Sequence, residues 1–364
     1  MQDSAYLILE NGTVFAGKSF GYAGETIGEV VFTTSMTGYL ETLTDPSFYG
    51  QIVTQTFPLI GNYGVIPSDF ESKKPHLTAY IVRQWCQHPS NFRCEGLLDT
   101  FLKEHKIIGL YGIDTRALTK IVREHGVMNA KIASGPAVTD ELLTELKNFQ
   151  IVDAVPHVTC EGESTYTPDE KKRRVVMWDF GAKEAIVREL VKRGCEVVRV
   201  PAQTSAERIL ELAPDGLMLS NGPGDPAANL PIVEEIKKVM QHKIPTFGIC
   251  LGHQLLALSQ GAGSEKLKYG HRGANQPVTD FESGRTFITS QNHGYAVVGD
   301  ELPAEMGEVA QVNANDGTCE GIKYKKWNCF TVQFHPEANG GPKDTEFLFD
   351  RFLNNVKAAK KEAR

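Results

Sequence analysis

The sequence predicts an α/β protein in which a smaller α+β domain precedes a doubly wound, mainly parallel sheet. Two observations predict this class. From residue 175 onward, short apolar segments alternate with helical patterns, as in the β-α-β units that build parallel sheets. Before residue 150, β-rich segments come first and helical patterns follow, which is typical of an α+β domain. We therefore expect domains at 1–152 and 174–364, joined by a linker at 153–173.

The amino-terminal domain is expected to place its strands before its helices. Runs rich in β-branched and aromatic residues predict strands at 6–10, 13–16, 29–33, 52–56 and 77–82. Apolar residues at helical spacing predict helices at 96–105, 116–124 and 139–147. The linker is predicted from its prolines, a glycine and the charged run at 169–174, a composition that favours a solvated connection.

The carboxy-terminal domain is expected to alternate strands and helices through its first half. Strands are predicted at 175–179, 196–200, 216–219 and 244–249, and helices at 183–192, 205–212, 232–240 and around 255–258. Later strands are predicted near 286–289, 308–312, 319–324 and 329–334, before a closing helix at 345–357. Open α/β sheets bind ligands at the carboxyl ends of their strands, so the loops after these strands are the candidate sites.

A Gly-x-Cys-x-Gly turn connects the apolar strand at 244–249 to the helix that follows. This is the nucleophile-elbow arrangement, with cysteine in the place of serine. Gly248 and Gly252 lack Cβ atoms, so the strand and the helix can approach closely around a strained turn. Cys250 begins the helix, where the partial positive charge favours a thiolate. We interpret Cys250 as a nucleophile, against the alternative of a small buried hydrophobic residue.

A nucleophilic cysteine needs a base and a group that orients the base. His335 and Glu337 follow a strand pattern and are two residues apart, so in an extended segment they project to the same face. We predict that His335 moves the proton and Glu337 holds the imidazole tautomer, as in the serine triad. Alone, this segment would be interpreted as a turn, and only its occurrence together with the elbow favours catalysis. His253 is expected to be structural.

The loop 221–226 follows the strand at 216–219 and is rich in glycine and proline. Pro223 has no N–H group and cannot donate a hydrogen bond. The N–H groups of Gly222, Gly224 and Leu251 are predicted to form an oxyanion hole for an acyl-transfer intermediate. The alternative is a tight turn between a strand and a helix.

These motifs together resemble those of class I (triad) glutamine amidotransferases. The segments that carry the resemblance are NGPGDP at 221–226, GICLGHQ at 248–254 and HPE at 335–337. The amino-terminal half resembles the small subunit of glutamine-dependent carbamoyl-phosphate synthase, in segments 28–39, 43–47, 58–62 and 112–119. The resemblance covers nearly the whole chain, and it implies a class I amidotransferase fold for the carboxy-terminal domain.

The resemblance implies that L-glutamine is hydrolysed through a thioester on Cys250 to glutamate and ammonia. A large synthetase subunit, paired with this chain as a heterodimer or in a higher oligomer, would use the ammonia with bicarbonate and ATP to make carbamoyl phosphate. The positions that match glutamine-binding residues of the family are Ser47, Gly222, Gly224, Leu251, Gln254, Asn292, Gly294 and Tyr295. Tyr295 stands where Phe is common, a mild change if its contact is through the backbone. Without the resemblance, Ser47, Asn292 and Gly294 would be turn residues and Gln254 a solvent-facing helix residue.

Composition excludes several functional classes. The net charge of −7 argues against nucleic acid as a main partner, and no run approaches 18 apolar residues, so we expect no membrane span. Seven cysteines without a Cys-x-x-Cys pair, and a start without a signal-peptide pattern, indicate a reduced cytoplasmic location. No His-Glu-x-x-His or Cys/His ligand spacing occurs, so we expect no metal on this chain. No ATP site is visible, so ATP and Mg²⁺ are expected on the partner.

Two other classes of function stay open from the sequence. The first is a free-standing Cys-His-Glu hydrolase or a different amidotransferase, which would not need the amino-terminal 150 residues. The second is a regulatory binding subunit in which the elbow is a relic, and the intact Cys250, His335 and Glu337 argue against it. Whether the product serves arginine synthesis, pyrimidine synthesis or both is not decided by any residue.

Overall fold

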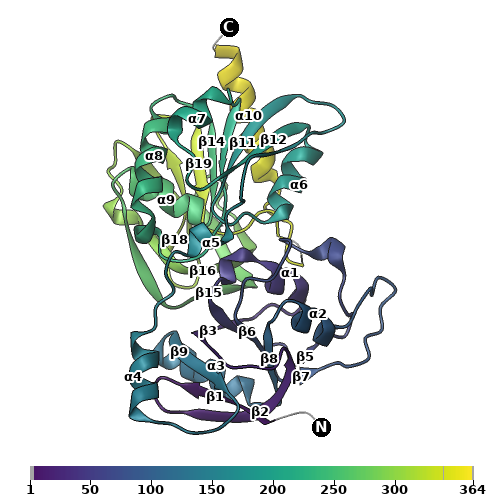
Figure 1. The fold of residues 1–364 in the computed structure, drawn as a ribbon. Coiled ribbons are helices and arrows are strands. Elements are labelled where there is room, and N and C mark those ends of the chain that lie inside the picture. Colours follow the sequence, from purple (N-terminus) through teal and green to yellow (C-terminus); the bar gives the residue numbers. More distant parts are fainter. Residues whose placement is uncertain (1–3, 339, 363–364) are drawn as a thin grey trace. The chain divides into compact units, whose positions relative to one another are not determined.

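The computed structural model describes the backbone of residues 4–338 and 340–362. It describes the side chains of the same residues except that of residue 362. The chain divides into two compact units, Met1–Val152 and Asp153–Arg364 (Figure 1). In the described residues, no helix has the length and apolar character that crossing a membrane requires.

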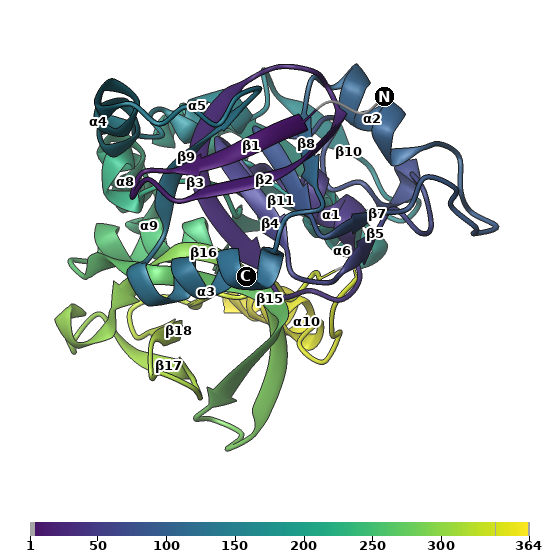
Figure 2. The same ribbon diagram turned by 90° about the horizontal axis from the view of Figure 1, so that it is seen from below.

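The first unit is built around a closed barrel of strands, visible from below in Figure 2. In barrel order the strands are β1 (Ser4–Leu9), β2 (Val14–Gly21), β8 (Ile108–Tyr111), β6 (Ala79–Val82), β4 (Gln51–Gln55), β3 (Thr26–Thr33) and β9 (Met128–Ala133). The sequence predicted five of these strands. It missed β8 and β9, and with them the closure of the barrel, in which Leu7 pairs with Ile132.

Helices and short segments cover the barrel of the first unit. The predicted helices are present as α2 (Leu98–Glu104), α3 (Thr115–His125) and α4 (Asp140–Asn148), and a short helix α1 (Tyr39–Thr44) was not predicted. Neighbouring residues of one strand, such as Ile52 and Val53, belong to different apolar clusters. This alternation follows from the two-residue period of a strand, which buries both faces of the sheet.

The second unit contains, in its described residues, a sheet of ten strands. In sheet order these are β10 (Ser164–Tyr166), β12 (Cys195–Pro201), β11 (Arg173–Asp179), β13 (Gly216–Leu219), β14 (Thr246–Ile249), β19 (Cys329–Val332), β18 (Cys319–Tyr324), β16 (Thr286–Val298), β15 (Gly263–Asp280) and β17 (Gly307–Asn313). The strands from β12 to β19 in this order are parallel, and the remaining neighbours pair antiparallel.

Helices cover both faces of this sheet. Helices α6 (Glu184–Lys192) and α10 (Phe347–Glu362) contribute to the apolar cluster on one face, while α7 (Ala206–Glu211), α8 (Leu230–Met240) and α9 (Leu251–Ser259) contribute to the other. Strands β12 and β13 lie on opposite sides of β11, so the strand order reverses there. The predicted α/β class, with a doubly wound sheet after a smaller α+β domain, is confirmed, and the reversal marks where such sheets bind ligands.

The segment 153–173, expected as a linker, carries regular structure and lies in the second unit. It forms helix α5 (Ala154–Val158) and strand β10, which pairs antiparallel with β12. The Thr159 hydroxyl and the Cys160 N–H donate to Asp179, at 2.6 and 2.9 Å. The prolines and charges that suggested a linker lie outside this edge strand: Pro156 is in α5, Pro168 follows β10, and the charged run leads into β11.

The hairpin of β15 and β16 is the largest departure from the predicted elements. The sequence predicted a strand only near 286–289, whereas β15 has 18 residues and β16 has 13. Glycines at 270 and 273 and a proline at 277 made β15 resemble a loop. Gly270 lies within an irregularity in register between Lys266 and His271, and Gly273 borders a second one before Gln276, whereas Pro277 pairs directly with Ile288.

Candidate active site

Cys250 stands at the junction of β14 and α9 with a φ of 53° and a ψ of −106°. A residue with a side chain rarely adopts a positive φ, and such a conformation costs about 1–3 kcal/mol. Two backbone hydrogen bonds hold the turn: the Cys250 N–H donates to the Val332 carbonyl and the Gly252 N–H to the Ser220 carbonyl, each at 2.9 Å. A Cβ at Gly252 would lie 2.4 Å from the Leu219 carbonyl oxygen, so this position requires glycine. The predicted elbow is confirmed in its geometry.

His335 and Glu337 lie on the segment that follows β19, the parallel neighbour of β14. Ile249 pairs with Val332, so Cys250 and the residues after β19 leave the sheet at the same edge. The His335 N–H donates to the Ser290 carbonyl at 2.9 Å, which ties this segment to β16. His335 Nδ1 lies 2.6 Å from Glu337 Oε1, and both side chains are buried.

This contact decides the tautomer of His335. A carboxylate only accepts hydrogen bonds, so Nδ1 carries the proton and Nε2 presents a lone pair. His335 Nε2 is buried and has no hydrogen-bond partner in the described residues. The arrangement therefore presents a buried base at the same edge of the sheet as the Cys250 elbow.

Lys183 is a residue of the site that sequence reasoning missed. Its Nζ lies 3.7 Å from Glu337 Oε1, and its side chain is mostly buried. Burial alone would raise the pKa of Glu337, but His335 and then Lys183 outweigh it and hold that pKa below its usual value. Glu337 is therefore a carboxylate at neutral pH. The sequence offered one indication that Lys183 belongs to the site: it follows the loop after β11, where the strand order reverses.

The loop after β13 lies against the start of α9. Asn221 is fully buried, and its Oδ1 accepts a hydrogen bond from the Lys183 N–H at 3.0 Å. A Cβ at Gly222 would lie 2.2 Å from the Phe180 carbonyl oxygen and 2.8 Å from the Leu251 side chain. The close packing therefore requires glycine at 222 and brings its backbone beside Leu251, as an oxyanion hole made from both would need. Gly224 lies two residues further along this loop.

Strand β16 brings its own predicted residues to the elbow. Cys250 Sγ lies 3.8 Å from the Asn292 carbonyl oxygen. Gln254 is buried, and its Nε2 donates to the Tyr295 carbonyl at 2.7 Å and to Gln333 Oε1 at 2.9 Å. Asn292, Gly294 and Tyr295 lie inside a long strand and not in a hairpin turn.

Ser47 and His253 have well-defined local settings. Ser47 is a buried residue of the first unit, in the short 3₁₀ helix Pro46–Phe48, and its N–H donates to Asp45 Oδ1 at 2.9 Å. Its part in the site stays a prediction.

His253 contacts Thr331 Oγ1 through Nδ1 at 2.8 Å, and burial lowers its pKa to about 3. This imidazole is neutral and tied to β19, in keeping with the structural role expected from the sequence.

The sheet with its cysteine elbow defines a class I glutamine amidotransferase domain, and residues 176–355 match the family model "Glutamine amidotransferase class-I". Residues 7–132 match "Carbamoyl-phosphate synthase small chain, CPSase domain". The chain belongs to the carbamoyl-phosphate synthase small-chain family, the small subunits of the glutamine-hydrolysing enzyme.

Curated relatives match the chain over nearly its full length. The "Carbamoyl phosphate synthase small chain" of Clostridium perfringens is 53% identical, and the match covers 96% of this chain and 98% of the relative. The protein of the same name from Bacillus cereus is 51% identical, over 98% of this chain and 97% of its own. A solved structure of a glutamine amidotransferase from Thermotoga maritima is 19% identical, with a TM-score of 0.39 over 52% of this chain and 83% of that chain.

Proposed function

We propose that this chain is the glutaminase subunit of carbamoyl-phosphate synthase and that it works through a Cys250, His335 and Glu337 triad. The observation that carries the proposal is the buried His335–Glu337 pair, at 2.6 Å, just after the strand that neighbours the one ending in the Cys250 elbow. A carboxylate, an imidazole with a free lone pair and a thiol at one sheet edge are what nucleophilic catalysis needs.

In the first half-reaction His335 Nε2 takes the thiol proton and Cys250 Sγ attacks the side-chain amide carbon of glutamine. The amide oxygen becomes an oxyanion, which the N–H groups of Leu251, Gly222 and Gly224 would stabilise. One such donor contributes about 3 kcal/mol to transition-state stabilisation. The imidazolium returns its proton to the amide nitrogen, the C–N bond breaks, and ammonia leaves behind a γ-glutamyl thioester.

In the second half-reaction water replaces ammonia. His335 Nε2 takes a proton from the water, the hydroxide attacks the thioester carbon, and the C–S bond breaks to release glutamate. The proton then returns to Cys250. Glu337 keeps His335 in one orientation and balances the positive charge that the imidazole carries twice in the cycle. The low pKa of Glu337 supports this role, because the group must stay ionised while buried.

The remaining family positions would hold the substrate. Gln254, in the first turn of α9, is itself such a position and connects to another by donating to the Tyr295 carbonyl. That bond uses the Tyr295 backbone, so it does not depend on which side chain stands at 295. Ser47, Asn292 and Gly294 complete the proposed glutamine contacts.

We further propose that the ammonia passes to a large synthetase subunit in a cytoplasmic complex with this chain. Carbamoyl phosphate synthesis consumes ATP and bicarbonate, and the proposed reaction on this chain needs no cofactor of its own. ATP and Mg²⁺ would therefore belong to the partner. The first unit, which the catalytic chemistry does not explain, would dock that partner.

The deciding experiment measures ammonia release from glutamine by the wild type and by Cys250→Ala, with and without a large subunit, ATP and bicarbonate. Activity that depends on Cys250 and rises with the partner is expected. Activity that ignores the partner would favour a free-standing hydrolase, and no activity in either setting would favour a regulatory subunit. Mass spectrometry of acid-quenched single turnovers should also find the γ-glutamyl adduct on Cys250.

A further inference from the structure

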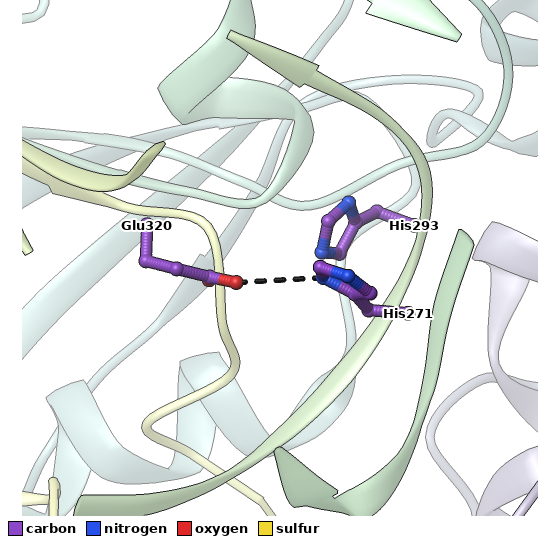
Figure 3. A group of neighbouring side chains, drawn as sticks. All are labelled: His271, His293 and Glu320. Carbon is purple, nitrogen blue, oxygen red and sulfur yellow. Dashed lines mark ion pairs between the residues drawn. The ribbon is translucent and has the colours of Figure 1, made fainter. Parts of the chain in front are cut away.

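A second group of functional side chains lies in the same unit, on the antiparallel part of the sheet. His271 on β15, His293 on β16 and Glu320 on β18 are all buried, and one ligand atom from each lies within 4.8 Å of the others (Figure 3). We propose that these three side chains bind a divalent transition-metal ion. Two imidazoles and a carboxylate are a donor set that suits Zn²⁺ and other first-row metals.

The sheet itself brings the three residues together. His271 and His293 are paired directly across β15 and β16, and their ring centroids are 5.0 Å apart. Directly paired residues point to the same face of a sheet, which explains why both rings reach one point. Glu320 comes from β18, where the preceding residue, Cys319, pairs with Val297 of β16. The ligands are therefore carried by paired strands and not by a flexible loop.

Hydrogen bonds outside the cluster hold one nitrogen of each histidine and leave the other directed at the cluster. His271 Nε2 lies 2.8 Å from Asp316 Oδ2, and His293 Nδ1 lies 2.8 Å from the Tyr295 carbonyl oxygen. Both oxygens only accept, so these nitrogens donate to them, and His271 Nδ1 and His293 Nε2 are the atoms directed at the cluster. A carboxylate and a backbone carbonyl are the usual outer partners of metal-binding histidines.

The atoms that meet in the cluster are of kinds that bind metals. His271 Nδ1 lies 3.5 Å from Glu320 Oε1, and His293 Nε2 lies 2.9 Å from Gln291 Oε1, a hydrogen-bond partner that the ion would displace. A proton shared between a nitrogen and a carboxylate brings them to about 2.7–2.9 Å. Two ligands that share a tetrahedral zinc ion, each at about 2.0–2.1 Å, are about 3.3 Å apart. The spacing of His271 and Glu320 is therefore closer to that of two ligands than to that of a hydrogen bond.

Glu320 supplies an independent observation. It is fully buried, its Oε1 accepts from Asn313 Nδ2 at 3.0 Å, and its Oε2 has no hydrogen-bond partner in the described residues. Within that part of the chain, its ion pairing involves His271 alone. A buried carboxylate is costly unless its charge and both of its oxygens are satisfied, and a metal ion would add positive charge and a partner for Oε2.

The metal would act on the part of β16 that the active site uses. The Tyr295 carbonyl accepts from His293 Nδ1 and also from Gln254 Nε2. Fixing His293 through its Nε2 would therefore restrain the same carbonyl that orients Gln254. The inference concerns binding and not catalysis, so its test does not depend on the glutaminase proposal.

The test uses the full chain with Cys250→Ala, which removes the nucleophilic thiol as a competing ligand. After treatment with a chelator, the protein is titrated with Zn²⁺ by calorimetry and with Co²⁺ by absorption spectroscopy. We expect one equivalent to bind, and the Co²⁺ spectrum to show d–d bands without a thiolate charge-transfer band. Zn²⁺ should also raise the Tm, because it binds the folded chain.

Variants then locate the ion. Glu320→Gln should weaken Zn²⁺ binding at least 100-fold and abolish the Tm increase, and Asp316→Asn should weaken it about 10- to 100-fold. His242→Asn, which removes an exposed histidine of the same unit, should bind as the parent does. The proposal would be overturned if the parent did not bind one equivalent of metal or if its Co²⁺ spectrum showed a thiolate band. It would also be overturned if Asp316→Asn and Glu320→Gln bound Zn²⁺ as tightly as the parent. If Glu320→Gln does not fold, the spectrum of the parent and the Asp316→Asn titration decide.

Discussion

Replacing Glu337 with glutamine is expected to lower kcat for glutamine hydrolysis by about 1,000-fold. Glutamine has nearly the same shape, and its amide oxygen can still accept from His335 Nδ1. What it lacks is the charge that faces the imidazolium across the 2.6 Å contact. Two opposite charges about 4 Å apart attract by about 4 kcal/mol at an effective dielectric constant of about 20, and each 1.4 kcal/mol is a factor of ten.

Lys183 adds to this effect. Its ammonium lies 3.7 Å from Glu337 Oε1, so a neutral residue at 337 leaves a positive charge beside the imidazolium. KM should change less than kcat, because Glu337 acts through His335 and the charge develops only in the transition state.

The assay is steady-state ammonia release in the presence of the large subunit, ATP and bicarbonate. Glu234→Gln, an exposed carboxylate on α8, is the matched control and should stay within twofold of the wild type. A folded Glu337→Gln enzyme, with a normal circular dichroism spectrum, that retains more than a tenth of the wild-type kcat would refute the reasoning.

The remaining predictions concern the elbow, Lys183 and acid stability. Gly252→Ala places a Cβ 2.4 Å from the Leu219 carbonyl and should cost about 2–3 kcal/mol of unfolding free energy by urea titration, whereas Gly162→Ala, with open space around it, should cost little. Lys183→Met removes an ammonium that lowers the pKa of Glu337, so this pKa, measured by carboxyl ¹³C NMR, should rise, and an unchanged value would contradict the electrostatic role. The pKa of Glu337 is lowered in the fold, so it contributes stability above its unfolded pKa of about 4.3 that is lost as the pH falls through the folded value. Unfolding free energies measured from pH 6 down to pH 3 should therefore fall less in Glu337→Gln than in the wild type, and equal slopes would contradict this account.

The parts of the site that could be predicted from sequence are those encoded by neighbours in the chain. Gly248, Cys250 and Gly252 define the elbow because the turn itself requires small residues at fixed spacing. The two-residue spacing of His335 and Glu337 was enough to expect a contact, and the structure has it at 2.6 Å, although residues 336–337 form a turn and not the expected extended segment.

The parts that could not be predicted depend on residues far apart in the chain. The barrel closes where β1 pairs with β9, as in the pairing of Leu7 with Ile132, and no local sequence pattern predicts this closure. Strand β15 was missed because its glycines and proline are loop signals that its partner strand overrides. His271, His293 and Glu320 are 22 and 27 residues apart, so a search for ligands at helical or zinc-finger spacing does not find them.

The positive φ of Cys250 means that the fold loses stability at the same position that carries the proposed nucleophile. Any side chain at 250 carries the conformational cost, and only glycine would be free of it. Cys250→Gly should therefore make the fold more stable than either the wild type or Cys250→Ala while it removes the nucleophile. Because the proposed nucleophile sits on the strained residue, a single substitution at 250 should be enough to give a more stable but inactive amidotransferase domain.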